Sequence, residues 1–306
     1  SQSWYGLYFQ DQITLWDKVH ILGGGRYDWS ETGQGFASTA ADAEMRRQQN
    51  EIEEEAFSPR VGLVYQPWPW ISLYGNYVES FGANNGLSAS GASFEAQRGE
   101  QYEVGIKTEW WDGRLSSTLA FYHLTRTNLL TADLSTENRF DFVAIGEARS
   151  RGIELDVSGR VTDQVSLIAS YAYTDAEITK DQGQDELGNP TPGNQGKDLP
   201  GAPAHAGSLW TKVEVVPERF EVGAGVYLVG ERPNDPANSF DIPGYGRLDA
   251  FAAYHWKLGA SRLTAQLNAK NILDKEYFFA NEPVNGGSAL LPGEPLTVIG
   301  SLRLEY

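Results

Sequence analysis

The chain has 306 residues, a formal net charge of −17 at pH 7, 12% aromatic residues and no cysteine. Its 41% of apolar residues exclude wholesale disorder. An acidic sequence pI near 4.6 argues against a nucleic-acid partner, which requires a basic face. The lack of cysteine excludes a disulfide framework, a zinc finger and a thiol nucleophile.

Taken in chain order, almost every window alternates apolar and polar residues with a period of two, which is typical of strands with one face in an apolar medium. In the last segment, Leu302 and Leu304 share one face, while Arg303 and Glu305 share the other. The pattern predicts about 13 strands, each long enough for a tilted membrane span of roughly 9 to 11 residues. They cover residues 4–16, 19–29, 57–66, 71–81, 101–110, 115–126, 143–158, 165–176, 204–215, 220–231, 245–256, 263–272 and 296–306.

The connections between these strands alternate in length. Short ones fall at 17–18, 67–70, 111–114, 162–163, 216–219 and 257–259. Long ones fall near 30–56, 82–100, 127–142, 177–203, 232–244 and 273–295. Tight turns on one rim and long loops on the other are typical of a membrane β-barrel.

The tryptophans support a barrel independently. A membrane barrel carries aromatic girdles at the level of the lipid headgroups. Six tryptophans lie at or beside short connections, namely Trp16, Trp68, Trp70, Trp110, Trp111 and Trp256. A soluble β-sandwich or lectin, the remote alternative, would place them mid-strand, where only Trp210 clearly lies. We therefore predict an all-β fold, an antiparallel transmembrane β-barrel.

Four stretches resemble the C-terminal half of TonB-dependent siderophore receptors, and they occur in that family's order. They are Gly99–Lys107 (GEQYEVGIK), Gly146–Leu155 (GEARSRGIEL), Leu199–Pro203 (LPGAP) and Asn268–Tyr277 (NAKNILDKEY). One departure is visible before the last strand, where the family's Gly-x-Pro-Arg reads Gly-Glu-Pro-Leu at 293–296. The missing arginine puts a local loop contact in doubt and leaves the fold unaffected.

The resemblance implies that residues 1–306 are the C-terminal portion of a 22-stranded plugged barrel. An odd number of antiparallel strands cannot close on itself without a parallel pair. Counting back from the last strand matches the first one to strand 10 of the 22, so we expect the plug domain and about nine strands to be absent. A native polypeptide of about 33.8 kDa, the mass of this chain, would contradict that expectation.

The resemblance also implies a function: an outer-membrane receptor and active transporter for a ferric siderophore, energised through the TonB system of a Gram-negative bacterium. The implied partners are the siderophore, the TonB complex acting through the missing N-terminal region, and outer-membrane lipid and lipopolysaccharide around a monomeric barrel. Two alternatives remain open: TonB-dependent uptake of another large ligand (cobalamin, haem or a glycan), and a passive porin.

Candidate ligand residues are aromatic, because siderophores are large and partly apolar and family members bind them with rings from the wall and loops. Tyr122 and Tyr227 fall in the lumen-facing phase near the long-loop end of their predicted strands, and Tyr245 begins a strand at the same level. With Phe278 and Phe279 in the last long loop, these are the predicted ligand-binding residues. We expect no cofactor, because iron arrives with its ligands supplied by the chelate. We also expect no catalytic residue and no metal site, since His20, His123, His205 and His255 are isolated on different strands.

An acidic stretch at residues 42–55 holds six carboxylates against Arg46 and Arg47. The pattern predicts a long loop that contains a short helical turn. A solvated loop face is the simplest interpretation. The alternative hypothesis is an acidic mouth that attracts neutral or cationic chelates and disfavours anionic ones.

Overall fold

The computed structural model describes residues 2–306 except 34, 36, 50, 85, 133–141, 182, 185–189, 192 and 285–286. Thirteen strands form one antiparallel sheet in which each strand pairs with its neighbours along the chain. They are β1 (Gln2–Leu15), β2 (Val19–Thr32), β3 (Ile52–Trp68), β4 (Ile71–Gly82), β5 (Gln97–Trp110), β6 (Leu115–Ala132), β7 (Phe142–Arg160), β8 (Val165–Lys180), β11 (His205–Val216), β12 (Phe220–Val229), β15 (Tyr245–Leu258), β16 (Ser261–Lys270) and β19 (Thr297–Glu305).

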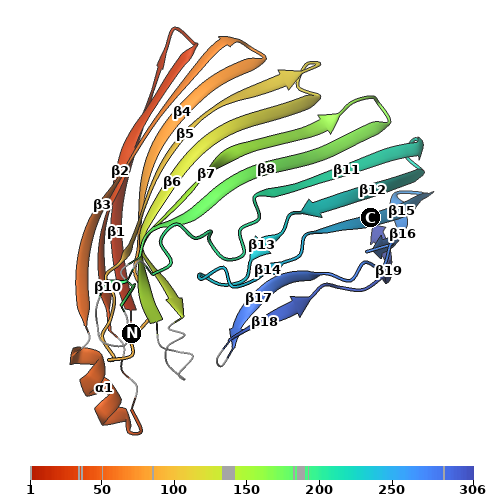
Figure 1. Cartoon of the computed structure of the whole chain (residues 1–306). Coiled ribbons are helices and arrows are strands. Elements are labelled where there is room, and N and C mark those ends of the chain that lie inside the picture. Colours follow the sequence, from red (N-terminus) through yellow and green to blue (C-terminus); the bar gives the residue numbers. More distant parts are fainter. Residues whose placement is uncertain are drawn as a thin grey trace.

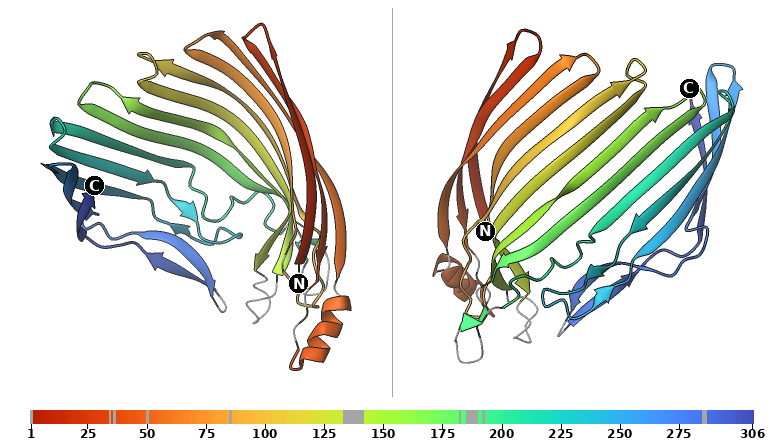
Figure 2. Two further views of the ribbon diagram at one scale, coloured as in Figure 1. Left: turned by 180° about the vertical axis from the view of Figure 1, so that it is seen from behind. Right: turned by 45° about the horizontal axis from the view of Figure 1, so that its top comes forward.

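The sheet curves into a wall whose two edges are β1 and β19 (Figure 1). Tight turns gather on one rim, here called the short-turn rim, and the long connections gather on the other, the long-loop rim (Figure 2). The predicted number of strands in the sheet and the alternation of connections are therefore confirmed. Several strands extend further toward the long-loop rim than predicted. No helix in the described part of the chain is long and apolar enough to cross a membrane.

The long connections hold one helix, where a short helical turn is predicted, and three hairpins that the sequence pattern does not reveal. One helix, α1 (Ala40–Gln49), lies between β2 and β3. Three small hairpins follow, formed by β9 (Gly183–Gln184) with β10 (Pro190–Thr191), β13 (Arg232–Pro233) with β14 (Asp241–Ile242), and β17 (Phe278–Val284) with β18 (Gly287–Pro292). Figure 1 shows them on the long-loop side of the sheet.

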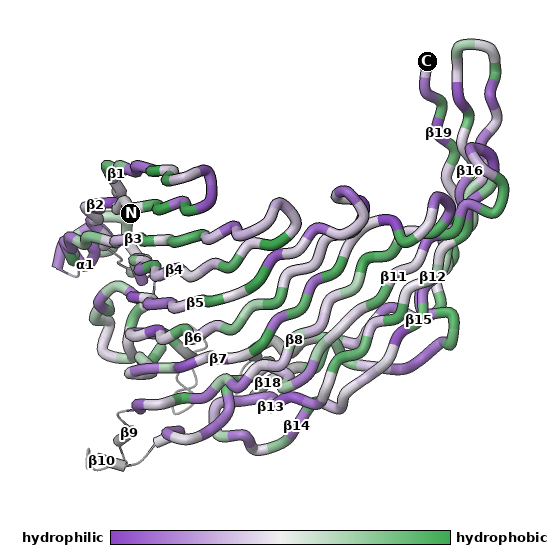
Figure 3. Tube along the Cα trace, turned by 90° about the horizontal axis from the view of Figure 1, so that it is seen from above, coloured by the Kyte–Doolittle hydropathy of each residue, from purple (hydrophilic) through white to green (hydrophobic). Residues whose placement is uncertain are grey.

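The strand register separates two faces. On the outward face, Ile106 lies between Leu73 and Leu119 on the neighbouring strands. On the opposite, lumenal face, Glu103 lies between Asn76 and Tyr122. Apolar and polar colours alternate along most strands in Figure 3. The outward face leaves side chains such as Val104 and Leu267 exposed, which is the arrangement of a wall that contacts hydrocarbon.

Aromatic rings line the short-turn rim as predicted. The Trp70 ring centroid lies 5.5 Å from that of Trp110 and 6.1 Å from that of Trp68. Trp16 lies in the β1–β2 turn and is 82% exposed. Indole rings with one apolar and one polar edge favour the headgroup level of a bilayer, so this belt marks one boundary of the membrane.

Two large lumenal rings lie flat across a glycine of the next strand. A Cβ atom at Gly225 would lie 2.2 Å from the Trp210 ring, and one at Gly152 would lie 2.9 Å from the Tyr122 hydroxyl. Glycine at these positions permits the close approach of ring and backbone.

Candidate functional site

A connected cluster of aromatic and charged side chains occupies the lumenal face of β11, β12 and β15. The Trp210 indole N–H donates to the Tyr227 hydroxyl at 2.7 Å. The Arg247 guanidinium carbon lies 4.5 Å from the centroid of the Tyr227 ring, a cation–π contact. Cross-strand register brings the three residues together, because Gly225 faces Trp210 and Arg247 faces Tyr227.

Arg247 links this cluster to the last long loop. Its Nη2 donates to Asp249 Oδ2 at 2.9 Å, and its Nη1 donates to the Tyr277 hydroxyl at 3.3 Å. The Tyr277 ring stacks on Tyr245 with centroids 4.2 Å apart. The arginine thus holds a loop tyrosine against the wall.

Asn271 closes the turn that carries Tyr277. Its backbone has a φ of 49°, a left-handed conformation that asparagine tolerates better than most residues. Its side chain is fully buried, accepts from the Lys275 N–H at 2.9 Å, and donates to the carbonyl oxygens of Lys275 and Glu294. Its own N–H donates to Asp249 Oδ1 at 2.8 Å. The turn and the wall are therefore joined through Asp249.

The structure brings two of the predicted ligand residues together. Tyr227 and Tyr245 line one hollow of about 480 Å³, with Arg247 beside them. Phe278 and Phe279 lie at the start of β17, directly after Tyr277, and Phe279 is 54% exposed. All four belong to β12, β15 and the last long loop.

Tyr122 lies apart from these four residues. It is on the lumenal face of β6, as predicted, and its hydroxyl lies 3.2 Å from Thr174 Oγ1. Because β6 extends to Ala132, Tyr122 is nearer the short-turn end of the strand than the long-loop end, where the sequence analysis placed it. Nothing in the structure tests whether any of the five residues contacts a ligand.

Four residues of this cluster and its surroundings were not predicted as candidate ligand residues from the sequence: Trp210, Arg247, Tyr277 and Arg232. The first two fall in the lumenal phase of predicted strands, so the alternation could have identified them. Tyr277 ends the Asn268–Tyr277 motif. Arg232 carried no signal, because it lies in a predicted loop and is buried only through contacts with distant segments.

The prediction of one acidic loop at residues 42–55 is wrong in part. Residues 40–49 form α1, but β3 already begins at Ile52, so the final glutamates belong to the sheet. Their side chains alternate between faces: Glu54 accepts from the Ala96 N–H at 2.8 Å, whereas Glu55 accepts from the Tyr27 hydroxyl at 2.7 Å. On α1, the hydrogen bond from Arg47 lowers the pKa of Glu44. The carboxylates thus do not form a single acidic face.

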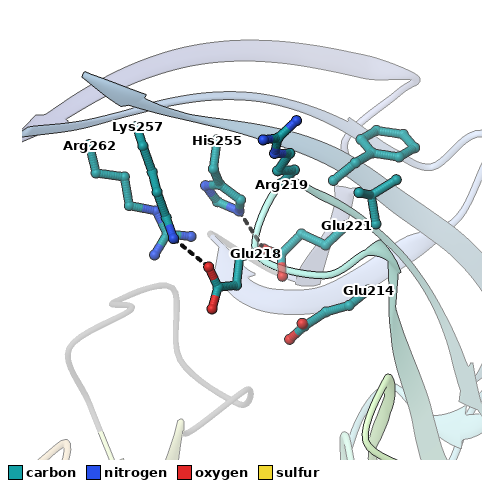
Figure 4. A pocket seen from close by; sticks show the side chains of 9 residues that line it. Glu214, Glu218, Arg219, Glu221, His255, Lys257 and Arg262 are labelled. Atoms are coloured by element: carbon teal, nitrogen blue, oxygen red, sulfur yellow. Dashed lines mark hydrogen bonds and ion pairs between the residues drawn. The ribbon is translucent and has the colours of Figure 1, made fainter. Parts of the chain in front are cut away.

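A second polar concentration lies on the lumenal face near the short-turn rim (Figure 4). Lys212 Nζ lies 2.9 Å from Glu221 Oε2, and His255 Nε2 lies 3.6 Å from the other oxygen of that carboxylate. Lys257 donates to Glu218, and this hydrogen bond lowers the pKa of the glutamate below its ordinary value. Most of these charges have partners within the cluster, so it resembles a solvated ion-pair network.

The described residues contain no group of three or more histidine, aspartate or glutamate side chains placed to hold a metal ion. The aromatic cluster offers ring faces, hydroxyl groups and a guanidinium. Such groups bind a ligand through stacking and hydrogen bonds.

Comparisons with known proteins identify a matching family and several relatives of this chain. Residues 1–272 match the family model described as TonB dependent receptor-like, beta-barrel. The chain is 36% identical over 304 residues to the metal-pseudopaline receptor CntO of Pseudomonas aeruginosa, which covers 98% of this chain and 40% of that protein. It is 34% identical over 276 residues to the ferrichrome outer membrane transporter/phage receptor of Escherichia coli K12, covering 89% and 34% respectively.

Among solved structures, the siderophore receptor PiuA from Acinetobacter baumannii superposes with a TM-score of 0.82 at 24% identity, over 98% of this chain and 43% of that one. This likeness shows the fold. The chain spans about two fifths of the length of CntO and about a third of the ferrichrome transporter. Members of the matched family are receptors and transporters, not enzymes. The chain belongs to the TonB-dependent receptor family and forms part of its outer-membrane β-barrel.

Proposed function

We propose that the protein is an outer-membrane receptor that binds a ferric siderophore at the long-loop rim and imports it with energy from the TonB system. One observation carries the proposal: along 98% of its length the chain aligns with a relative named as a metal-pseudopaline receptor. The ferrichrome transporter, which covers 89% of the chain, also supports a ferric siderophore as the ligand. Family membership favours a gated receptor over a passive porin.

The wall's role in this proposal is recognition without metal coordination. A ferric chelate arrives with the iron already ligated, so the protein contacts the organic shell. Tyr245, with Tyr277 stacked behind it, offers a rigid ring at low entropic cost, and Phe279 offers an exposed one. The iron itself needs no side chain of this chain.

The partners follow from the same proposal. The TonB complex acts through a part of the receptor outside this chain. Hydrocarbon and lipopolysaccharide surround the outward face, which carries the exposed apolar side chains. The barrel functions as a monomer, and no nucleic acid is involved.

Growth under iron limitation tests this function. A strain lacking the receptor gene is complemented with the full natural gene and supplied with one defined ferric siderophore at a time. We expect at least one to restore growth only when TonB is intact. Restoration by cobalamin, haem or a glycan instead, in the matching auxotroph or carbon-limited medium, would overturn the siderophore assignment.

Phe279→Ala is expected to weaken chelate binding by roughly fivefold, since partial burial of a phenyl ring against a ligand contributes about 1 kcal/mol. The side chain is 54% exposed, so the change should leave the thermal unfolding midpoint nearly unaltered. Equilibrium binding of the siderophore that supports growth measures the effect. Leu273→Ala, at a position in the preceding turn that is 69% exposed, is the control. Equal affinity of both variants would remove Phe279 from the binding site.

A further inference from the structure

Arg232 is a buried cation whose partners within this chain are incomplete. Arg232 lies in β13 and is only 4% exposed. Nη2 donates to the Phe278 carbonyl oxygen at 2.9 Å. Nη1 is buried and has no hydrogen-bond partner among the residues that the structure describes. Among the ion pairs of the described residues, none includes Arg232, whereas Arg247 is paired with Asp249.

Such an arrangement is costly unless an anion completes it. A guanidinium stays protonated in proteins and has five N–H donors. A buried charge without a partner is strongly unfavourable, so buried arginines are normally paired. Arg232 and Arg247 both act electrostatically on the Tyr245 hydroxyl. In the part of the chain that the structure describes, Asp249 forms an ion pair with Arg247 and not with Arg232.

The position of Arg232 points to a ligand. Its bond to the Phe278 carbonyl ties it to the start of the last long loop, beside the exposed Phe279. Tyr277, the residue before Phe278, stacks on Tyr245. Arg232 therefore belongs to the same group of segments as four of the five predicted ligand residues, on the long-loop side of the sheet.

We propose that Arg232 binds a carboxylate arm of the incoming chelate, with Arg247 adding to the positive potential at that position. This inference rests on the proposed function and narrows its substrate class to chelates that carry a free carboxylate. A planar guanidinium matches a carboxylate in geometry and forms short, charge-assisted hydrogen bonds with it. The acidic residues near α1 do not oppose this, because they are divided between the helix and two faces of β3.

The test uses the full natural protein in detergent, with metal-free citrate as the carboxylate probe. The thermal unfolding midpoint is measured against citrate concentration at constant ionic strength, balanced with chloride. We expect the wild-type midpoint to rise with citrate and the Arg232→Gln variant to need at least about tenfold more citrate for the same rise, as for a lost hydrogen bond to a charged group. Arg219→Gln, an exposed arginine in the β11–β12 turn, is the control and should behave as wild type.

Arg232→Lys keeps the inference testable if the glutamine variant does not fold. It retains the charge and loses the planar fork, so citrate should still protect it with a weaker apparent affinity. A wild-type midpoint that does not respond to citrate would overturn the inference and indicate that another part of the protein supplies the anion. Unchanged citrate response in both variants would overturn it as well.

The two proposals fail separately. Citrate protection that depends on Arg232, combined with no ferric siderophore supporting growth, would leave the carboxylate site intact and refute the siderophore function. Siderophore-dependent growth without any citrate response would refute the carboxylate site and leave the siderophore function intact. Among chelates that do bind, Arg232→Gln should weaken those with a free carboxylate and leave the cationic ferrioxamine B within about twofold of wild type.

Discussion

Replacing Asn271 by alanine is expected to lower the free energy of unfolding by about 3 kcal/mol. The change removes the acceptor of the Lys275 N–H and the donor to two carbonyl oxygens, all at a fully buried position. It also places alanine at a φ of 49°, where a Cβ-bearing residue without a polar side chain is strained. The denaturant midpoint of the full protein in detergent measures the loss.

Asn268→Ala is the matched control for this prediction. Asn268 lies three residues earlier on β16, and the one hydrogen bond its side chain makes among the described residues comes from Gln266. We expect its removal to change the midpoint little. If the two alanine variants unfold at the same denaturant concentration, the turn at Asn271 does not join the last long loop to the wall in the way described.

Leu267→Arg is expected to destabilise the barrel by about 2 to 4 kcal/mol, the cost measured for arginine on a lipid face near the membrane midplane. Leu267 is on the outward face of β16, where its neighbours in register are Ala252 and Gly300. It is 54% exposed, which only a hydrocarbon environment makes favourable. The yield of folded, protease-resistant protein in the outer membrane and its denaturant midpoint report the change.

Gln266→Arg introduces the same side chain one residue earlier and on the lumenal face, between Ala253 and Ser301. Because this face is polar, the control should insert at nearly wild-type yield. Equal losses from both substitutions would mean that the two faces of β16 meet similar surroundings, and the assignment of the outward face to lipid would then fail.

The sheet could be predicted from sequence because its two faces meet different media. A period-two pattern repeated over strands such as 57–66 and 101–110 specifies both the element and which of its side chains share a face. The hairpins β13–β14 and β17–β18 could not be predicted, since their strands are short and are held by contacts with distant residues. The Arg232–Phe278 hydrogen bond joins residues 46 positions apart, and no local pattern signals it.

The candidate site was predictable only in part for a related reason. Tyr227 and Tyr245 were identified because their phase on a strand is a local property. Their stacking and cation–π partners, Tyr277 and Arg247, depend on which strands become neighbours and at what offset. The final glutamates of the acidic stretch were assigned to a loop, but β3 begins at Ile52, before the predicted strand start at residue 57. Their carboxylates alternate between the two faces of that strand.

The rings that lie against Gly225 and Gly152 affect the space on the lumenal side of the sheet. A ring that lies along the backbone of the adjacent strand adds little thickness to the tube, so the free diameter inside is governed by the main chain. A methyl group at Gly225 would displace the Trp210 ring toward the lumen, whereas one at Gly152 would meet the Tyr173 carbonyl oxygen at 2.1 Å before it met the Tyr122 ring. The width of the space inside the sheet at these two levels therefore depends on residues that contribute no side chain to it.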